Sequence, residues 1–415
     1  AQFGEGKAVK NHLSPVDPNP QSVEVTLDLT RINHVLGTAL NVDEVTNILH
    51  RLQFNVQVSD EVFKVTVPAR RWDIHIPADI LEEIARIYGY DNLPSTLPTG
   101  PTTIGRLTTS QQAIRRIREL LQGSGLNQAM SYGLTTVQKA KMFMMQESEE
   151  TKLDFPMSQD HAVLRMNLIS GLLDDVAYNV ARKVANVALY EQGRVFYRTA
   201  GVDRPSEVEH LAGAITGSMI SKSWYGKEVP VDFYQLKGIV SLLLHDMNFE
   251  KSVSYVANQD RPEMHPGRTA DIYLGDQVIG FIGQVHPQLE KEFKIPETYV
   301  FELNLQAILD APKKIQHYEP ISKYPAITRD VALVIDKEVS NTEIEATLRE
   351  KSNHHLEQIQ LFDVYSGKHI PENKKSVAYT LTYRDKHNTL TEDEVNKEFE
   401  QAIAALKAAF EIEIR

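Results

Sequence analysis

The 415-residue sequence contains no cysteine, so it can form neither disulfides nor thiolate metal sites. It also has no apolar run near the roughly 20 residues needed to cross a bilayer, and no signal peptide is visible. The mean hydropathy is −0.32. These absences predict a protein of a reducing compartment with no membrane segment, and we expect it in the cytoplasm.

Positive charge is also scarce. Lysine and arginine number 44 against 56 aspartate and glutamate residues, which gives a net charge of −12. Because nucleic-acid binding depends on neutralising phosphates, this balance excludes a protein whose whole surface attracts nucleic acid. Any RNA contact must therefore be local.

Common phosphate-binding and nucleophile motifs are missing as well. The sequence has no Walker-type G-x-x-x-x-G-K-[ST] loop and no G-x-S-x-G elbow. His265 and His286 each precede a proline and lack partners at metal-ligand spacing, so we interpret them as turn residues. The middle of the chain therefore shows no recognisable set of catalytic residues.

The most informative stretch is RWDIHIPADILEEIARIYGYDNLP, residues 71–94. Pro77 suits the first turn of a helix, and Gly89 suits its end. At about 100° per residue, the apolar side chains fall on one face of that helix and the acidic ones on the other. An extended lead-in adds one more carboxylate, and the full set is Asp73, Asp79, Glu82 and Glu83.

Two interpretations of these carboxylates stay open at the level of residue types. Oxygen ligands from a loop and one helical turn suit a hard divalent cation such as Mg²⁺. Acidic residues in a first helical turn also complement the positive end of the helix dipole and need no metal.

The stretch RRWDIHIPADILEEIARIYGYDNLP, with the segments quoted below, resembles the bacterial phenylalanyl-tRNA synthetase β-subunit family over essentially the whole chain. The resemblance implies that Asp73, Asp79, Glu82 and Glu83 form a magnesium site shared with an α subunit.

The length predicts two to four domains, and the patterning favours a multidomain α+β chain. Residues 1–20 are proline-rich and are interpreted as a linker, so we expect a fragment that lacks its N-terminal part. Residues 21–95 predict a winged-helix-like module of paired helices and a hairpin. Its helices carry few basic residues, which favours a structural role over nucleic-acid binding. We expect Thr30 and Asn41 to cap its first two helices.

Residues 96–320 predict one α+β domain with an antiparallel sheet and flanking helices. MSQDHAVLRMNLISGLL and HPGRTADI resemble the family's domain that copies a class II synthetase catalytic core without performing the chemistry. An active core carries G-x-G-x-x-R, whereas the nearest pattern here, beginning at Gly123, ends without arginine. Arg194, Arg198 and Arg268 remain as possible phosphate ligands, and Arg268 is the most suggestive of them, although a Pro-Gly before a strand is more often just a turn.

Residues 321–415 predict the order βαββαβ, which is the ferredoxin-like arrangement. Asn341 is expected to cap the first helix, and Thr391 with Glu394 predicts a capping box for the second. YPAITRDVALV and YRDKHNTLTEDEV resemble the family's anticodon-binding domain. With 13 basic and 17 acidic residues, the segment has net charge −4, so RNA must meet a restricted face. The tRNA-binding candidates are Lys323, Tyr324, Arg329, Arg384, Lys386 and His387.

The resemblance implies the β subunit of a phenylalanine–tRNA ligase made of two α and two β chains. The α subunit would join phenylalanine to tRNA(Phe) through an adenylate formed from ATP and Mg²⁺, and this chain alone would be inactive. The family's editing modules would be missing from these residues. The alternative is a stand-alone synthetase-like paralogue that binds RNA and catalyses nothing, and copurification with a partner chain separates the two.

Overall fold

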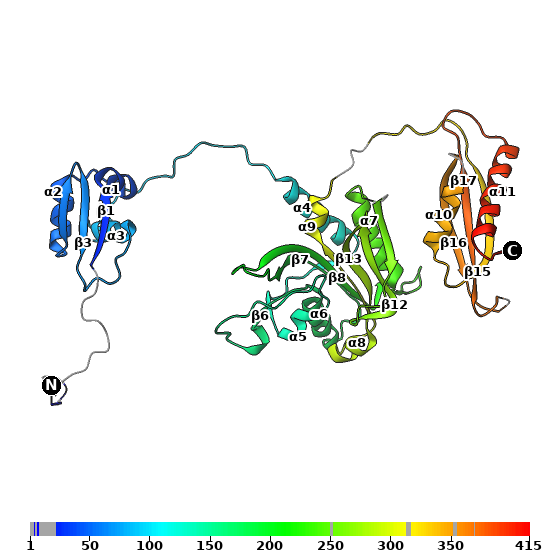
Figure 1. Cartoon of the computed structure of the whole chain (residues 1–415), viewed down its shortest axis with the longest axis horizontal. Helices are drawn as coiled ribbons and strands as arrows, with labels where there is room; N and C mark the ends of the chain where they lie inside the picture. Colours follow the sequence, from blue (N-terminus) through cyan, green and yellow to red (C-terminus); the bar gives the residue numbers. More distant parts are fainter. Residues whose placement is uncertain are drawn as a thin grey trace. The chain divides into compact units, whose positions relative to one another are not determined.

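The computed structural model describes residues 4, 6–7, 22–249, 252–312, 317–351, 355–368 and 370–415. The predicted linker over residues 1–20 lies almost entirely outside this part. The chain divides into two compact units, residues 1–106 and 107–415 (Figure 1). Within the described ranges, no helix has the length and apolar character that a membrane crossing requires.

The first unit is a three-stranded sheet packed against three helices. Its elements are β1 (Val23–Asp28), α1 (Leu29–Leu36), α2 (Val42–Arg51), β2 (Asn55–Ser59), β3 (Val62–Val67), α3 (Pro77–Tyr88) and a short 3₁₀ helix, Tyr90–Asn92. The sheet order is β1-β3-β2, antiparallel throughout. Asp60 and Glu61 join β2 to β3 with φ angles of 48° and 64°, as a tight hairpin turn requires. The predicted hairpin is therefore confirmed.

Helix caps in this unit agree only partly with the sequence predictions. Asn41 caps α2 and forms a capping box with Glu44, as expected. The cap of α1 is Asp28 rather than Thr30, because the Asp28 carboxylate accepts the backbone N–H of Arg31 and the helix begins one residue later. The Thr30 prediction was wrong by two positions.

A seven-stranded sheet organises residues 107–312. The helices are α4 (Thr109–Gly123), α5 (Val137–Lys141), α6 (Ile169–Ala181), α7 (Phe233–Asp246), α8 (Pro287–Phe293) and α9 (Leu305–Asp310), with a 3₁₀ turn at Gln159–His161. The strands of this sheet are β4 (Asn127–Gln128), β7 (Val187–Tyr197), β8 (Ser206–Thr216), β11 (Val253–Ala257), β12 (Met264–Leu274), β13 (Gln277–Val285) and β14 (Thr298–Asn304). Two small ribbons pair β5 (Leu134–Thr135) with β6 (Val163–Leu164) and β9 (Ser218–Ile220) with β10 (Val229–Pro230).

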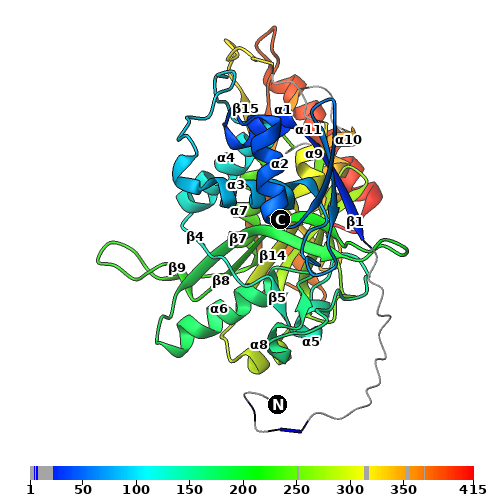
Figure 2. The same cartoon turned by 90° about the vertical axis from the view of Figure 1, so that its left-hand side faces the viewer.

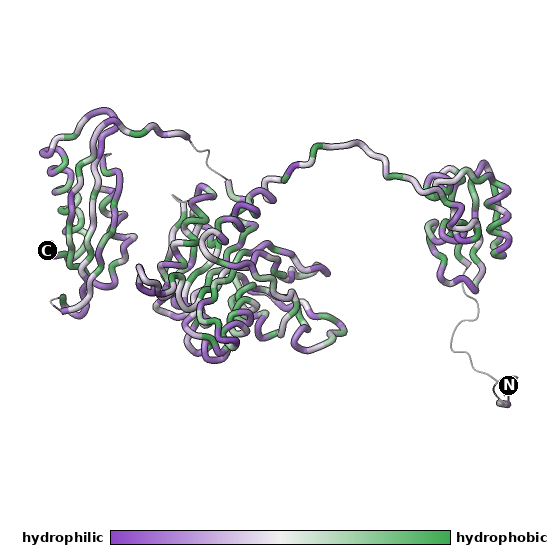
Figure 3. The backbone as a smooth tube through the Cα atoms, turned by 180° about the vertical axis from the view of Figure 1, so that it is seen from behind, coloured by the Kyte–Doolittle hydropathy of each residue, from purple (hydrophilic) through white to green (hydrophobic). Residues whose placement is uncertain are grey.

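The strand order is β11-β12-β13-β14-β8-β7-β4, and every pair except β4–β7 is antiparallel. Side chains alternate across it: Leu211 and Ile215 of β8 join the cluster around α4 and α7, while Ala212 and Ala214 join the cluster around α6. Helices therefore cover both faces of the sheet (Figure 2), and apolar residues concentrate in its strands (Figure 3). The predicted antiparallel sheet with flanking helices is confirmed.

The C-terminal segment has the predicted βαββαβ order. Its elements are β15 (Ile327–Asp336), α10 (Asn341–Lys351), β16 (Leu356–Tyr365), β17 (Lys374–Tyr383), α11 (Glu392–Ala409) and β18 (Glu413–Ile414). The sheet order is β16-β17-β15-β18, and both helices pack on one face through a shared apolar cluster. The Thr391–Glu394 capping box is present. The cap of α10 is Ser340, whose hydroxyl accepts the N–H of Glu343, so the Asn341 prediction was wrong by one residue.

A close approach at the centre of the large sheet requires glycine. Gly213 of β8 lies opposite Phe301 of β14, and a Cβ added at Gly213 would lie 2.4 Å from a carbon of the Phe301 ring. Phe301 is fully buried, so its ring cannot move away without disturbing the surrounding core. Phe301 therefore occupies the volume that a side chain on β8 would otherwise fill.

We predict that Gly213→Ala destabilises the chain by about 1–3 kcal/mol, because the extra methyl group overpacks the site of Phe301. Gly238→Ala in α7 is the matched control, since nothing lies within 4 Å of the added Cβ. That substitution should stabilise the chain by about 0.5–1 kcal/mol through helix propensity. Urea unfolding of both variants checks the pair, and equal midpoints would contradict the packing assignment.

Candidate functional site

The start of α3 is fixed by local hydrogen bonds. Pro77 is its first residue, as predicted, and one carboxylate oxygen of Asp79 accepts the backbone N–H groups of His75 (2.8 Å) and Ile76 (2.9 Å). These two amides point out of the helix start and would otherwise have no partner within the helix. Asp79 therefore serves as the third-position acceptor of a capping arrangement.

Two other carboxylates of the set are joined by an arginine that the sequence analysis did not single out. The Arg71 guanidinium donates to both oxygens of Asp73, through Nη2 at 2.7 Å and Nε at 2.9 Å. The same Nη2 lies 3.0 Å from Oε1 of Glu83, whose other oxygen accepts Nη2 of Arg86 at 2.6 Å. The Glu83 side chain is 8% exposed and that of Arg71 is 23% exposed, so this pairing lies at the edge of the core.

The pKa values follow these contacts. The Arg71 hydrogen bonds lower the pKa of Asp73 to about 2 and also lower the pKa of Glu83, where burial partly opposes the effect. The backbone N–H groups lower the pKa of Asp79. Asp73 and Glu83 raise the pKa of Arg71 in turn. All three carboxyl groups are therefore ionised near neutral pH, and two of them are already compensated within the chain.

The structure does not gather the four predicted metal ligands around one point. Glu82 is exposed, Asp79 is turned to the backbone, and Asp73 and Glu83 are held by Arg71. Across the described residues, no group of three or more His, Asp or Glu side chains is placed to hold a metal ion. The metal assignment stays a prediction. The sequence does indicate one of the ion pairs that compete with a metal, because Glu83 and Arg86 lie three residues apart on a helix.

The tRNA-binding candidates come from two segments that the sheet register brings together. Ile327 of β15 pairs with Tyr383 of β17, so the residues before one strand and after the other lie at the same sheet end. A hydrogen bond of 3.2 Å from Arg384 Nη1 to the Tyr324 carbonyl joins them directly. Lys323 is exposed at this end.

Most of the positive charge at this sheet end has a partner within the chain. Arg384 donates to Glu357 at 3.0 Å, and Lys386 lies 2.9 Å from Glu319. Arg329 donates to the Asn396 side chain and lies 4.0 Å from Glu392. His387 is exposed, and its backbone N–H donates to Asp385. The result is an edge of mixed charge, in keeping with the net charge of the segment.

The three arginines considered as phosphate ligands do not converge. Arg194 pairs with Glu207 at 2.5 Å and lies 3.6 Å from Glu209. Arg268 donates to the side chains of Gln284, Glu297 and Tyr299 at 2.9, 3.2 and 3.1 Å. Arg198 is exposed and directly follows the end of β7. Two of the three therefore serve internal contacts.

The ring nitrogens of His265 and His286 accept hydrogen bonds from backbone groups two residues further along the chain. Nδ1 of His265 accepts the N–H of Gly267, and Nδ1 of His286 accepts the N–H of Gln288 where α8 begins. Both interactions span two residues. The turn interpretation was wrong for His265, which lies within β12 where the pairing with β13 shifts register, and His286 is the N-cap residue of α8.

A buried polar cluster in the large sheet was missed. Glu302 of β14 is fully buried and accepts the N–H groups of Leu168 and Ile169 at the start of α6. Its other oxygen lies 2.7 Å from Nδ1 of His210, which is 1% exposed. The only sequence signal is one carboxylate within the apolar run TYVFELNL.

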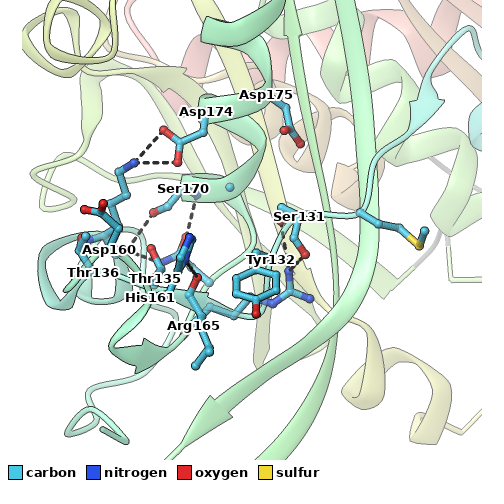
Figure 4. Close-up of a pocket in the computed structure, with 15 residues that line it drawn as sticks. Ser131, Tyr132, Thr135, Thr136, Asp160, His161, Arg165, Ser170, Asp174 and Asp175 are labelled. Carbon is cyan, nitrogen blue, oxygen red and sulfur yellow. Dashed lines mark hydrogen bonds and ion pairs between the residues drawn. The ribbon is translucent and has the colours of Figure 1, made fainter. Parts of the chain in front are cut away.

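A polar cavity of about 380 Å³ lies beside the N-terminal half of α6 (Figure 4). Lys139 pairs with Asp174 at 2.7 Å, and Arg165 pairs with the buried Glu191 at 2.6 Å. Burial and the neighbouring Glu191 and Asp174 raise the pKa of Asp175. Both basic side chains named here are thus paired with carboxylates, and the lining includes none of the predicted site residues.

Family models match this chain in three consecutive segments. The model described as "tRNA synthetase B5 domain" matches residues 25–90, and "Phenylalanyl tRNA synthetase beta chain CLM domain" matches residues 93–305. The third, "Ferredoxin-fold anticodon binding domain", matches residues 322–415.

Similar curated proteins carry one name, phenylalanine–tRNA ligase beta subunit. The protein from Lactiplantibacillus plantarum is 56% identical over 415 residues, which is 100% of this chain and 52% of its own length. The protein from Bacillus subtilis is 44% identical over 410 residues, 99% of this chain and 50% of its own. A solved pyrrolysyl-tRNA synthetase from Desulfitobacterium hafniense aligns with 48% of this chain and 68% of its own at 14% identity and a TM-score of 0.37, too loosely to carry an argument.

The curated relatives show how much of such a protein these residues represent. The chain spans about half the length of each of the two relatives. One family model alone covers residues 93–305, and the identity extends over the whole sequence. The chain therefore belongs to the phenylalanyl-tRNA synthetase β-chain family.

Proposed function

We propose that this chain is the C-terminal part of the β subunit of a phenylalanine–tRNA ligase. It works with an α subunit, as two α and two β chains, to join phenylalanine to tRNA(Phe) through an adenylate formed from ATP. The observation that carries the proposal is the order of three family segments along one chain, at 25–90, 93–305 and 322–415. We divide the chain accordingly into a module at 21–95, a synthetase-like domain at 96–320 and an anticodon-binding domain at 321–415.

The chemistry is assigned to the α subunit. The sequence lacks the G-x-G-x-x-R element of an active class II core. Arg194 and Arg268, which could otherwise bind ATP phosphates, are committed to carboxylate and polar side chains of this chain. These contacts favour a structural role for residues 96–320 and argue against a role in activating an amino acid.

The anticodon-binding proposal rests on the C-terminal sheet end. Lys323 and His387 are exposed there, and Arg384 ties the two segments together. Such an edge offers a few cations to phosphates and rings to unpaired bases. Because acidic partners surround it, the number of phosphate contacts must be small.

The magnesium proposal rests on donor chemistry. Carboxylate oxygens are the ligands that Mg²⁺ prefers, and Asp73, Asp79, Glu82 and Glu83 supply four such groups within eleven residues of sequence. Their present arrangement does not fit an ion, because Arg71 holds two of them and Glu82 faces solvent. A bound Mg²⁺ would supply positive charge where the partner subunit meets this helix. Within the chain, Arg71 and Arg86 supply it.

We predict different outcomes for Asp79→Ala and Glu82→Ala. Asp79→Ala removes the acceptor of two backbone amides, so the amides of His75 and Ile76 should lose most of their protection from hydrogen exchange without any divalent ion. Glu82→Ala should leave this exchange unchanged and weaken only Mg²⁺-dependent association with the α subunit. Unchanged exchange in the Asp79 variant would refute the capping role.

The functional proposal predicts that charging of tRNA(Phe) requires both chains. A complex of this chain with the α subunit should aminoacylate tRNA, and deletion of residues 321–415 should abolish charging while leaving phenylalanine activation by α largely intact. Aminoacylation at limiting tRNA checks this. Equal charging by the intact and the truncated complexes would show that the anticodon assignment is wrong.

The salt dependence of tRNA binding gives a separate prediction. Two or three phosphate contacts to single-stranded RNA give a slope near −2 in log K against log salt, at about −0.7 per phosphate. Lys323→Ala should make the slope shallower by about 0.7, whereas Lys407→Ala, at an exposed position of α11, should not change it. An equal change in both variants would contradict the local edge.

A further inference from the structure

The carboxylate group of the first unit already contains a cation. Arg71 uses Nε and Nη2 on Asp73, and the same Nη2 reaches Glu83 at 3.0 Å. The Arg71 side chain is 23% exposed, and its guanidinium also lies 5.8 Å from the centre of the Phe54 ring. Three independent contacts hold it, so this is a defined position and not a loose surface pair.

Arg86 contributes less to the same group. It reaches only Glu83, and its side chain is 47% exposed. Arg71 contacts Asp73 in the extended lead-in and Glu83 in α3. Among the described residues it is the only arginine that joins these two segments. The Arg71 side chain therefore holds the lead-in and α3 together and neutralises their carboxylates, as a shared metal ion would do.

The guanidinium and a divalent ion cannot occupy the group together in this geometry. Mg²⁺ binds carboxylate oxygens at about 2.0–2.1 Å. The oxygens of Asp73 and of Glu83 that face each other already accept Arg71 at 2.7–3.0 Å. An ion placed on both would meet a positive charge at close range, and that repulsion disfavours binding.

We propose that Arg71 is the resident counter-cation of the Asp73–Glu83 carboxylates, and that a divalent ion binds there only by displacing Arg71. The displacement rests on the magnesium site of the proposed function, whereas the counter-cation role does not. The chain then has weak intrinsic affinity for Mg²⁺, and binding is coupled to a movement of the 71–73 segment.

The test uses the full 415-residue chain carrying Trp224→Phe, which leaves Trp72 as its one tryptophan. Trp72 lies between Arg71 and Asp73 in sequence, so it sensitises the luminescence of Tb³⁺ bound at this group, and Mg²⁺ is then added as competitor. Arg71→Met should tighten Tb³⁺ binding by at least about tenfold, because it removes the competing charge. Arg86→Met is the matched control and should change the affinity less.

A second measurement needs no metal. Hydrogen exchange of residues 71–89 should become faster in Arg71→Met, and adding Asp73→Asn to that variant should cause little further change, because the Asp73 carboxylate pairs with Arg71 alone among the ion pairs of the described residues. Additive effects of the two substitutions would overturn the counter-cation role.

The outcomes separate this inference from the proposed function. Equal Tb³⁺ affinity of the parent chain and the Arg71→Met variant would overturn the displacement of Arg71. If Glu82→Gln weakened Tb³⁺ binding in the same experiment, the metal site would still be supported. No Tb³⁺ binding in either chain, together with coupled exchange effects of Arg71 and Asp73, removes the magnesium site and supports Arg71 as the cation of the group.

Discussion

Neutralisation of carboxylates within the chain is the constraint on which this structure depends. Glu302 lies fully buried at the centre of the large sheet, where an unpaired charge would be strongly destabilising. Its oxygens accept two backbone amides at the start of α6 and face His210 on β8. One side chain thus links β14, β8 and α6, and it fixes the start of α6 on the sheet.

The same constraint operates at the surfaces that the family relationship makes functionally interesting. In this chain of net charge −12, acidic side chains outnumber basic ones. Arg71 neutralises Asp73 and Glu83, and Arg384 and Lys386 have acidic partners. A cation that binds these carboxylates, or a phosphate that binds these basic side chains, must therefore compete with ion pairs inside the chain.

Patterning predicted the elements well where period and turn chemistry agreed. The order βαββαβ, Pro77 at the start of α3 and the Asn41 capping box all follow from local rules. The caps assigned to Thr30 and Asn341 were wrong because a neighbouring residue, Asp28 or Ser340, offers an equally good acceptor one or two positions earlier. When two neighbouring residues can both accept the first backbone N–H groups, the sequence predicts the start of a helix only to within one or two residues.

The candidate sites were less predictable because their geometry depends on long-range contacts. The carboxylates were found from spacing, but Arg71 lies twelve residues from Glu83 and only the folded lead-in brings them together. The tRNA-binding candidates were named from resemblance, and the β15–β17 register explains why their two segments meet. Nothing in the apolar run of β14 indicates that His210 would face Glu302, since that pairing is set by the sheet.

We propose that this chain supports a synthetase whose chemistry takes place in the α subunit. Phenylalanine-dependent exchange of pyrophosphate into ATP can be measured on the purified chain before and after addition of the α subunit. We expect no exchange by the chain alone and exchange once α is present. Exchange by the chain free of α would show that these residues activate the amino acid themselves.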